Sequence, residues 1–240
     1  MRGEVITMLS DSPFICTGFA NQTFNILNIL TDEGYECHQL AHSFIGQILP
    51  PPIRLLDGTT IRYTVHGNSF KPYFQDIMTY KIRETKANVF GVLLDTFMLW
   101  PWYMQINTNP AKTFFYFPSD GGGGLPLGCE NILKRTDYPI AMSRFAQNQA
   151  KEVHGINCDH IPHGCDTELF RQLEQNEKDE VKAKYGLKDR FVVGLVSRNQ
   201  PRKMIDGVIK TFALFCKNRS DAVLFLHSDP DDAATVFSMR

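Results

Sequence analysis

Strand-like and helix-like segments alternate along almost the whole chain, and this alternation constrains the fold more than any other feature of the sequence. The clearest strand is the stretch Val89–Asp95, which is apolar up to its last residue and therefore predicts a strand covered on both faces. Strands that alternate with helices build parallel sheets with helices on both faces. We therefore expect a doubly wound α/β protein.

The hydrophobic periodicity also predicts where the elements lie. Strands are expected at 4–9, 35–40, 61–65, 89–95, 112–117, 138–143, 160–162, 191–196 and 222–227, and helices at 24–32, 74–86, 144–153, 173–184 and 204–218. Asn21 or Thr23 is the expected cap of the first helix, and Ser143 of the helix at 144–153, because all three residue types accept hydrogen bonds from free backbone N–H groups.

Composition narrows the class of protein. A chain of 240 residues with 43% hydrophobic and 21% charged residues is typical of a soluble globular protein of one large or two modest domains. The net charge of −1 argues against general nucleic-acid binding. Six scattered cysteines without a C-x-x-C pair argue against a zinc site and predict a reduced, cytoplasmic setting. No stretch is long and apolar enough for a signal sequence or a membrane span.

A basic cluster follows the predicted strand at 191–196. Arg198, Arg202 and Lys203 lie at the expected carboxyl end of that strand, directly before a helix. A helix N-terminus offers free N–H donors and positive dipole, and Arg and Lys add full charge, so this arrangement is typical of a phosphate-binding site. A solvated basic turn explains the same residues equally well.

Several short segments follow one another in a fixed order: TGFANQT at 17–23, VLLD ending at Asp95, YFPSDGGGGLP at 116–126, AMSRFAQNQAKE at 141–152, IPHGCDTELF at 161–170 and SRNQPRK at 197–203. From about residue 10 to residue 227 the chain thereby resembles the GT-B nucleotide-sugar glycosyltransferases of the family 4 type, particularly compact archaeal and viral-like members. The Arg-x4-Lys spacing of that family is present as Arg198 and Lys203. Met204 stands where the family usually has glycine.

The resemblance implies two Rossmann-like domains and a hexosyltransferase activity. A sugar would pass from a nucleoside-diphosphate donor to a glycan, lipid or protein acceptor, with retention of configuration and without a metal ion. Arg198 and Lys203 would neutralise the departing diphosphate, with Arg202 in support. The nucleotide sugar is then a substrate, and no further cofactor is expected. The carboxylates Asp229, Asp231 and Asp232 are expected to form a solvated loop rather than a metal site.

Three further residues are candidates for the site. Asp95 and Asp120 lie at the carboxyl ends of predicted strands, where open α/β sheets bind ligands, and either could orient the acceptor hydroxyl or act as a base. Aspartates at such positions are more often helix caps or hydrogen-bond anchors. Gly18 could bring the backbone close to the donor, or belong to an ordinary strand–helix turn. The run Gly121–Gly124 fits a mobile acceptor-side loop or a plain connector.

The expected domains are residues 1–172, a connecting helix at 173–187 and a partial second domain at 188–240. The family's E-x7-E segment is missing from this last part, so we expect a chain that is truncated in its C-terminal domain. A glycosyltransferase is the favoured function, and a non-catalytic nucleotide- or glycan-binding remnant is the alternative. A dinucleotide-dependent oxidoreductase is a weaker third hypothesis, because no G-x-G-x-x-G follows the first strand.

Overall fold

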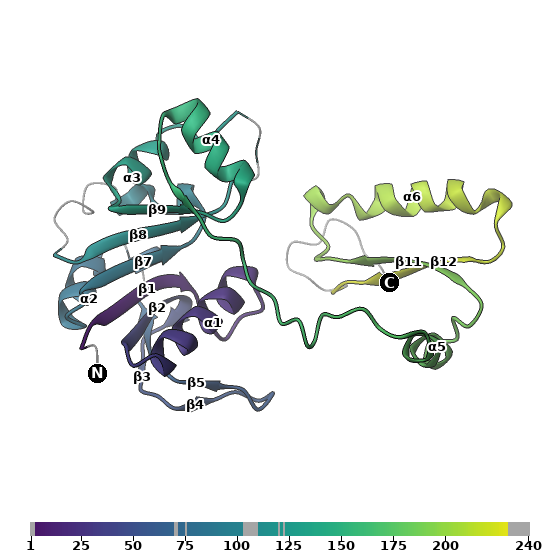
Figure 1. The fold of residues 1–240 in the computed structure, drawn as a ribbon, viewed down its shortest axis with the longest axis horizontal. Helices are drawn as coiled ribbons and strands as arrows, with labels where there is room; N and C mark the ends of the chain where they lie inside the picture. The colour runs from purple at the N-terminus through teal and green to yellow at the C-terminus, as the bar shows by residue number, and fades with distance from the viewer. Residues whose placement is uncertain are drawn as a thin grey trace. The chain divides into compact units, whose positions relative to one another are not determined.

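The computed structural model describes residues 3–69, 72–74, 76–102, 110–119, 121 and 123–229. The chain divides into two compact units, Met1–Cys165 and Asp166–Arg240. The domain boundaries expected near residues 172 and 188 stay predictions. The expected α/β architecture is confirmed in both units, because strands and helices alternate and pair in parallel (Figure 1).

The described part of the first unit contains an eight-stranded sheet with the order β10-β9-β8-β7-β1-β2-β6-β3. All strand pairs in it are parallel except β3–β6. Its strands are β1 (Val5–Asp11), β2 (Glu36–Ile45), β3 (Ile48–Leu49), β6 (Thr64–Asn68), β7 (Val89–Leu93), β8 (Lys112–Phe117), β9 (Tyr138–Ala141) and β10 (Asp159–His160). A separate antiparallel hairpin joins β4 (Ile53–Arg54) to β5 (Thr60–Ile61).

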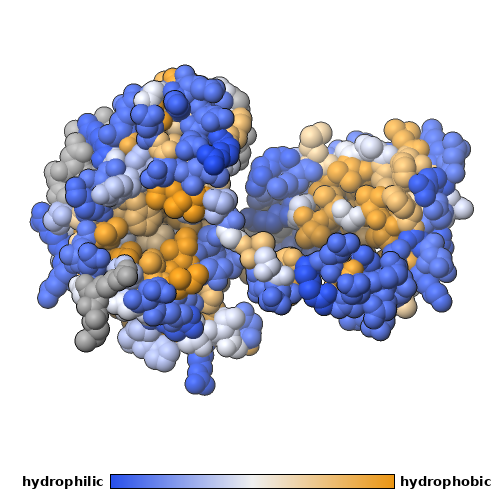
Figure 2. All heavy atoms as spheres, viewed as in Figure 1, coloured by the Kyte–Doolittle hydropathy of each residue, from blue (hydrophilic) through white to orange (hydrophobic). Residues whose placement is uncertain are grey.

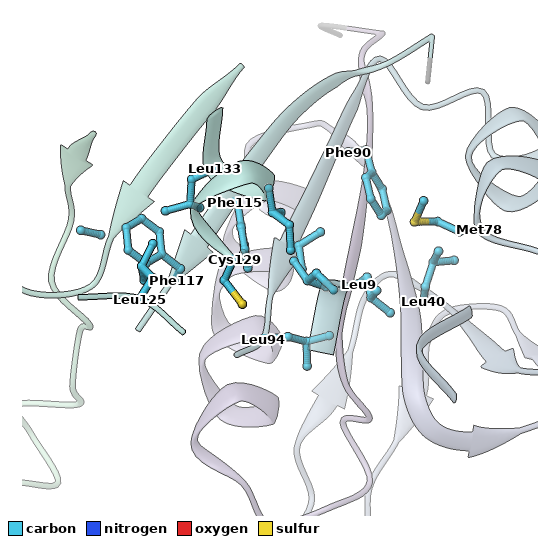
Figure 3. Close-up of a cluster of buried hydrophobic side chains, with 14 of the residues drawn as sticks. Leu9, Leu40, Met78, Phe90, Leu94, Phe115, Phe117, Leu125, Cys129 and Leu133 are labelled. Carbon is cyan, nitrogen blue, oxygen red and sulfur yellow. The ribbon is translucent and has the colours of Figure 1, made fainter. Parts of the chain in front are cut away.

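Helices cover both faces of this sheet. They are α1 (Gly18–Asp32), α2 (Met78–Glu84), α3 (Glu130–Arg135) and α4 (Arg144–His154), with 3-10 turns η1 (Pro72–Phe74) and η2 (Thr96–Trp102). Side chains of α2, α3 and α4 pack with Leu9 and Phe115 on one face, as Figure 3 shows for part of this cluster. Leu27 of α1 packs with Ile6 and Met8 on the other face. Alternate residues of β1 therefore pack into two separate hydrophobic cores, as expected for a strand that is covered on both faces.

The second unit is a β-α-β arrangement preceded by a surface helix. It contains α5 (Gln175–Lys184), β11 (Phe191–Val196), η4 (Pro201–Lys203), α6 (Ile205–Phe215), η5 (Cys216–Asn218) and β12 (Ala222–His227). β11 and β12 pair in parallel, with Phe191 opposite Ala222. The Arg219 guanidinium lies 4.6 Å from the centre of the Phe191 ring and also bonds to Asp221, which holds the amino-terminal end of this pair together.

Burial in the second unit is shallow. Among its described residues, 166–229, only Asn199 and Ile205 are fully buried. Figure 2 shows apolar side chains gathered at the surface of α6 and the β11–β12 pair. They line an apolar groove of about 690 Å³ that includes Phe191, Val208 and Phe212. The described residues of this unit therefore bury little hydrophobic surface of their own.

Four local expectations are wrong. The strand expected at 61–65 is divided between β5, which ends at Ile61, and β6, which begins at Thr64. The first helix begins at Gly18, and its cap is Thr17 rather than Asn21 or Thr23, because the Thr17 hydroxyl accepts a hydrogen bond from Ala20 N–H at 3.1 Å. The α-helix expected at 74–86 is confined to Met78–Glu84. The second strand continues beyond residue 40 to Ile45. No helix in the described part of the chain is long and apolar enough to cross a bilayer.

Candidate functional site

The carboxyl ends of three adjacent strands bring titratable side chains to one edge of the first sheet. Asp11, the last residue of β1, lies opposite His42 of β2. On its other side β1 pairs with β7, with Ser10 opposite Leu93, and Asp95 follows two residues later. All three titratable side chains are partly exposed. Open α/β sheets bind their ligands at this edge, so Asp95 lies where the sequence predicted it.

Tyr73 is added to this edge by an unusual turn. Its ring stacks on His42, with ring centroids 4.2 Å apart and an angle of 22° between the planes. Tyr73 and Phe74 both have positive φ, 56° and 57°, and Asn68 Oδ1 accepts the Phe74 N–H at 3.2 Å. Left-handed backbone costs a non-glycine residue about 1–3 kcal/mol, and such strain concentrates at functional sites.

The electrostatics of this edge are shared among its groups. Burial lowers the pKa of His42, and the negative charge of Asp11 partly opposes that shift. Burial raises the pKa of Tyr73, and the charges of Asp11 and Asp95 raise it further. Nδ1 of His42 is buried without a hydrogen-bond partner among the described residues. At neutral pH the lowered pKa of His42 favours a neutral imidazole, and the raised pKa of Tyr73 favours a protonated phenol.

Asp11 is fixed in place from two directions. The Thr17 hydroxyl donates a hydrogen bond to Asp11 Oδ2 at 2.6 Å, and the buried Gln39 amide donates to the Asp11 backbone carbonyl at 2.7 Å. Tyr63 in turn donates its hydroxyl proton to Gln39 Oε1 at 3.0 Å. A carboxylate held in this way is pre-organised to accept hydrogen bonds from a ligand on its remaining lone pairs.

Asp95 and the glycine run belong to one cavity. A space of about 360 Å³ is lined by Asp95, Ser119 and the glycines at 121, 123 and 124, among other residues. Gly124 has a φ of 98°, and a Cβ there would lie 2.5 Å from Nε2 of His154. That nitrogen accepts the Leu125 N–H at 2.9 Å. The end of the glycine run is therefore anchored to α4. Asp120, the second predicted carboxylate, lies outside the described residues.

The basic cluster of the second unit lies where the sequence placed it. Ser197 N–H still bonds to the His227 carbonyl at 3.1 Å, so the following segment leaves the sheet at the carboxyl end of β11. Arg202 and Lys203 close the 3-10 turn η4, and α6 begins two residues after Lys203. Arg198, Arg202 and Lys203 are all exposed. Exposed cations beside a helix N-terminus can bind a phosphate group.

Met204 gives this loop its shape. Its φ and ψ are 48° and 44°, a left-handed conformation that glycine adopts without strain. This is the position where the family resembled by the sequence usually has glycine. The local backbone therefore has a geometry that glycine favours, although a methionine occupies the position.

Gly18 does not behave like the other candidates. It is the first residue of α1, exposed and without positive φ, and a Cβ built on it would meet nothing within 4 Å. Packing therefore does not require a glycine there, and its proposed approach to the donor stays a prediction.

Sequence reasoning missed Asp11, His42 and Tyr73. Asp11 carried a signal similar to that of Asp95, because each lies within two residues of the end of an apolar run at the carboxyl edge of the sheet. His42 lies beyond the expected end of its strand. Tyr73 reaches the edge through a left-handed turn, which the sequence did not indicate because neither Tyr73 nor Phe74 is a residue type that favours positive φ.

No protein-family profile matches the sequence, and no curated protein matches it. Solved structures do match the fold. HepE from Anabaena, in complex with UDP, has a TM-score of 0.61 at 14% identity, over 94% of this chain and 61% of that one. The chain has a GT-B-like fold.

Two further structures agree with this fold assignment. A glycosyltransferase from Rickettsia africae ESF-5 has a TM-score of 0.61 at 13% identity, over 95% of this chain and 69% of that one. The catalytic domain of starch synthase IV from Arabidopsis thaliana, bound to ADP and acarbose, has a TM-score of 0.56 at 11% identity. The match covers 94% of this chain and 68% of that one. The chain spans about 60% of the length of the HepE structures.

Proposed function

We propose that the chain is a nucleotide-sugar glycosyltransferase of the GT-B type, similar to family 4 and to its compact archaeal and viral-like members. The observation that carries the proposal is the cluster Arg198, Arg202 and Lys203, which lies between the carboxyl end of β11 and the start of α6. The GT-B-like fold supports it, because two of the similar structures hold UDP or ADP. A glycan, lipid or protein is the acceptor class, and the cytoplasm is the proposed location.

The proposed reaction follows from the two sets of side chains. The acceptor hydroxyl oxygen forms a bond to the anomeric carbon of the donor while the bond from that carbon to the diphosphate oxygen breaks. Arg198 and Lys203 stabilise the negative charge that develops on the diphosphate, so we propose that no metal ion is needed. Asp95 accepts a hydrogen bond from the acceptor hydroxyl and orients it. In a retaining reaction the hydroxyl proton passes to the departing phosphate oxygen.

Calorimetric titration with UDP, GDP and ADP tests the donor site. The wild-type chain should bind at least one nucleotide. The Arg198→Ala/Lys203→Ala variant should lose about 1.5–3 kcal/mol of binding free energy per residue, because charge-assisted hydrogen bonds to phosphate disappear. Lys188→Ala is the matched control, since Lys188 is exposed and precedes β11 instead of following it.

Equal losses in the control and in the double variant would indicate nonspecific attraction of the nucleotide and count against the site. Nucleotide binding without sugar release from any nucleotide sugar would favour the alternative, a non-catalytic binding module. The shallow burial of the described residues of the second unit is the observation that supports a non-catalytic binding module.

A further inference from the structure

A second cavity in the first unit lies apart from Asp95 and the glycine run. It encloses about 420 Å³ between the β1–α1 loop, the first turns of α1 and the β4–β5 hairpin. Its apolar wall includes Pro13, Phe24 and Leu55, and its polar groups include Thr17, Asn21 and Asp57. A cavity of this size with a few convergent polar groups on an apolar lining is typical of a small-molecule site.

The cavity is held open by the protein itself. Asn28, which is buried on α1, donates its side-chain amide to the Thr60 carbonyl at 3.2 Å and accepts the Arg62 N–H at 2.9 Å. Arg62 also bonds to Asp32 at 2.7 Å. These contacts fasten the hairpin to α1, beside which it lies in Figure 1. The cavity is therefore pre-formed, so a ligand does not have to order its walls.

Its charge excludes one broad class of ligand. No Lys or Arg is among the described residues that line it, whereas Asp57 does line it. Thr59 donates its hydroxyl at 2.7 Å and its N–H at 2.9 Å to Asp57 Oδ1, and these bonds lower the pKa of Asp57 and keep it ionised. An anionic ligand would meet this carboxylate without a compensating cation. A ligand with several hydroxyl donors and an apolar ring face matches both the polar and the apolar walls.

One hydrogen bond connects this cavity to the carboxyl edge of the sheet. Thr17 lines the cavity, and its hydroxyl donates to Asp11 Oδ2 at 2.6 Å. Asp11 acts electrostatically on both His42 and Tyr73. A ligand that contacts Thr17 is therefore one hydrogen bond away from the Asp11 carboxylate.

We propose that this cavity binds the acceptor and that the acceptor is an uncharged sugar or glycoside. The inference rests on the proposed glycosyl transfer and deepens it by naming the acceptor class. Asp57 and Asn21 bond to hydroxyl groups of the ring, and Phe24 and Leu55 contact its apolar face.

Ligand-detected NMR titration of the full chain tests the proposal with named probes. Glucose, maltose and lactose are the uncharged probes, glucuronate and glucose 6-phosphate the anionic ones, and glucosamine the cationic one. At least one uncharged probe should bind about tenfold more tightly than the anionic probes. Asp57→Asn should weaken that binding about tenfold and reduce the discrimination against anions, because a charged acceptor of hydrogen bonds is lost.

The matched control is Glu33→Gln, which removes an exposed carboxylate at the opposite end of α1. It should leave saccharide binding unchanged. Phe24→Leu, which keeps an apolar side chain, should weaken binding of the uncharged probe without affecting the charge preference. Unaltered binding in both Asp57→Asn and Phe24→Leu would overturn the proposal, as would a preference for glucosamine.

Parallel titration with UDP, GDP and ADP separates this proposal from the proposed function. Nucleotide binding without binding of any saccharide probe would refute the acceptor cavity and leave the donor site standing. Saccharide binding that depends on Asp57, without nucleotide binding, would support the cavity and refute the transferase.

Discussion

Thr17 joins helix α1 to Asp11 through a single hydroxyl group. Its Oγ1 donates to Asp11 Oδ2 at 2.6 Å and accepts the Ala20 N–H at 3.1 Å. The helix cap and the orientation of a carboxylate at the ligand-binding edge therefore depend on the same atom. Few substitutions can preserve both contacts.

Thr17→Val should lower the free energy of unfolding by about 1–2 kcal/mol, because the helix loses its cap and Asp11 loses a donor. Thr17→Ser keeps the hydroxyl and should stay within about 0.5 kcal/mol of wild type. Urea denaturation followed by circular dichroism measures both. Equal losses in the two variants would show that the hydroxyl is not the source of the stability.

Met204→Gly should stabilise the second unit by up to about 1 kcal/mol, because glycine adopts a φ of 48° without strain. Met204→Ala is the control, since it also removes the long side chain but keeps a Cβ in the left-handed conformation. The midpoint of thermal unfolding distinguishes them. A rise only in the glycine variant supports the strain, and a fall in both would mean that the methionine side chain matters more.

Gly18 and Gly67 should respond in opposite ways to alanine. A Cβ on Gly18 meets open space, so Gly18→Ala should be neutral or stabilising by up to about 1 kcal/mol. A Cβ on Gly67 would lie 2.7 Å from the backbone nitrogen of Gly46, so Gly67→Ala should destabilise by 2 kcal/mol or more, roughly the cost of overpacking. Denaturation midpoints test both. Weaker UDP binding in Gly18→Ala would support the role predicted for Gly18 from the sequence.

The histidine pair on β2 and β6 should make stability depend on pH. His66 is buried, its Nε2 lies 3.1 Å from Nδ1 of His38, and Glu36 Oε1 lies 3.1 Å from Nε2 of His38. The pKa of His66 is lowered to about 4, mainly by burial and further by the neighbouring His38 and Lys81, while Glu84 opposes the shift.

In the unfolded chain the His66 imidazole therefore takes up a proton near pH 6.5, whereas in the folded chain it stays neutral at this pH. The contribution of His66 is complete above pH 6.5 and is lost as the pH falls towards 4, by up to about 3 kcal/mol. His66→Gln should flatten the stability curve in this interval, and His160→Gln, which removes a histidine from the edge strand β10, is the matched control. Parallel curves for wild type and His66→Gln would contradict the assignment.

Strands with a strong apolar signal could be predicted from the sequence. β8 and β11 have the expected bounds, because four aromatic residues in a row end β8 and β11 contains only apolar residues and one glycine. Ser143 caps α4 as expected, accepting the Ala146 N–H at 3.0 Å. Asp95 could be placed at the carboxyl edge of the sheet for the same reason, since it lies two residues beyond the end of a buried strand.

The remaining parts depend on contacts that carry no local signal. The strands of the β4–β5 hairpin have two residues each, too few to show a periodicity, and the hairpin is held by Asn28 from a distant helix. β2 continues through Ser43, whose φ is 66°, with an irregular register against β6 between Ala41 and Ile45. Tertiary pairing and not residue type decides these segments.

The shallow burial of the second unit has a consequence for hydrogen exchange. Backbone amides of β11 and β12 are protected only while this small unit stays folded, and it buries few side chains with which to resist opening. An anion bound to Arg198 and Lys203 would stabilise the folded state of the second unit, because it binds this state and not the unfolded one. Amides far from the ligand, along the whole β11–β12 pair, should then exchange more slowly, while those of the first sheet keep their rates. The lifetime of this strand pair would thus report the occupancy of the basic loop.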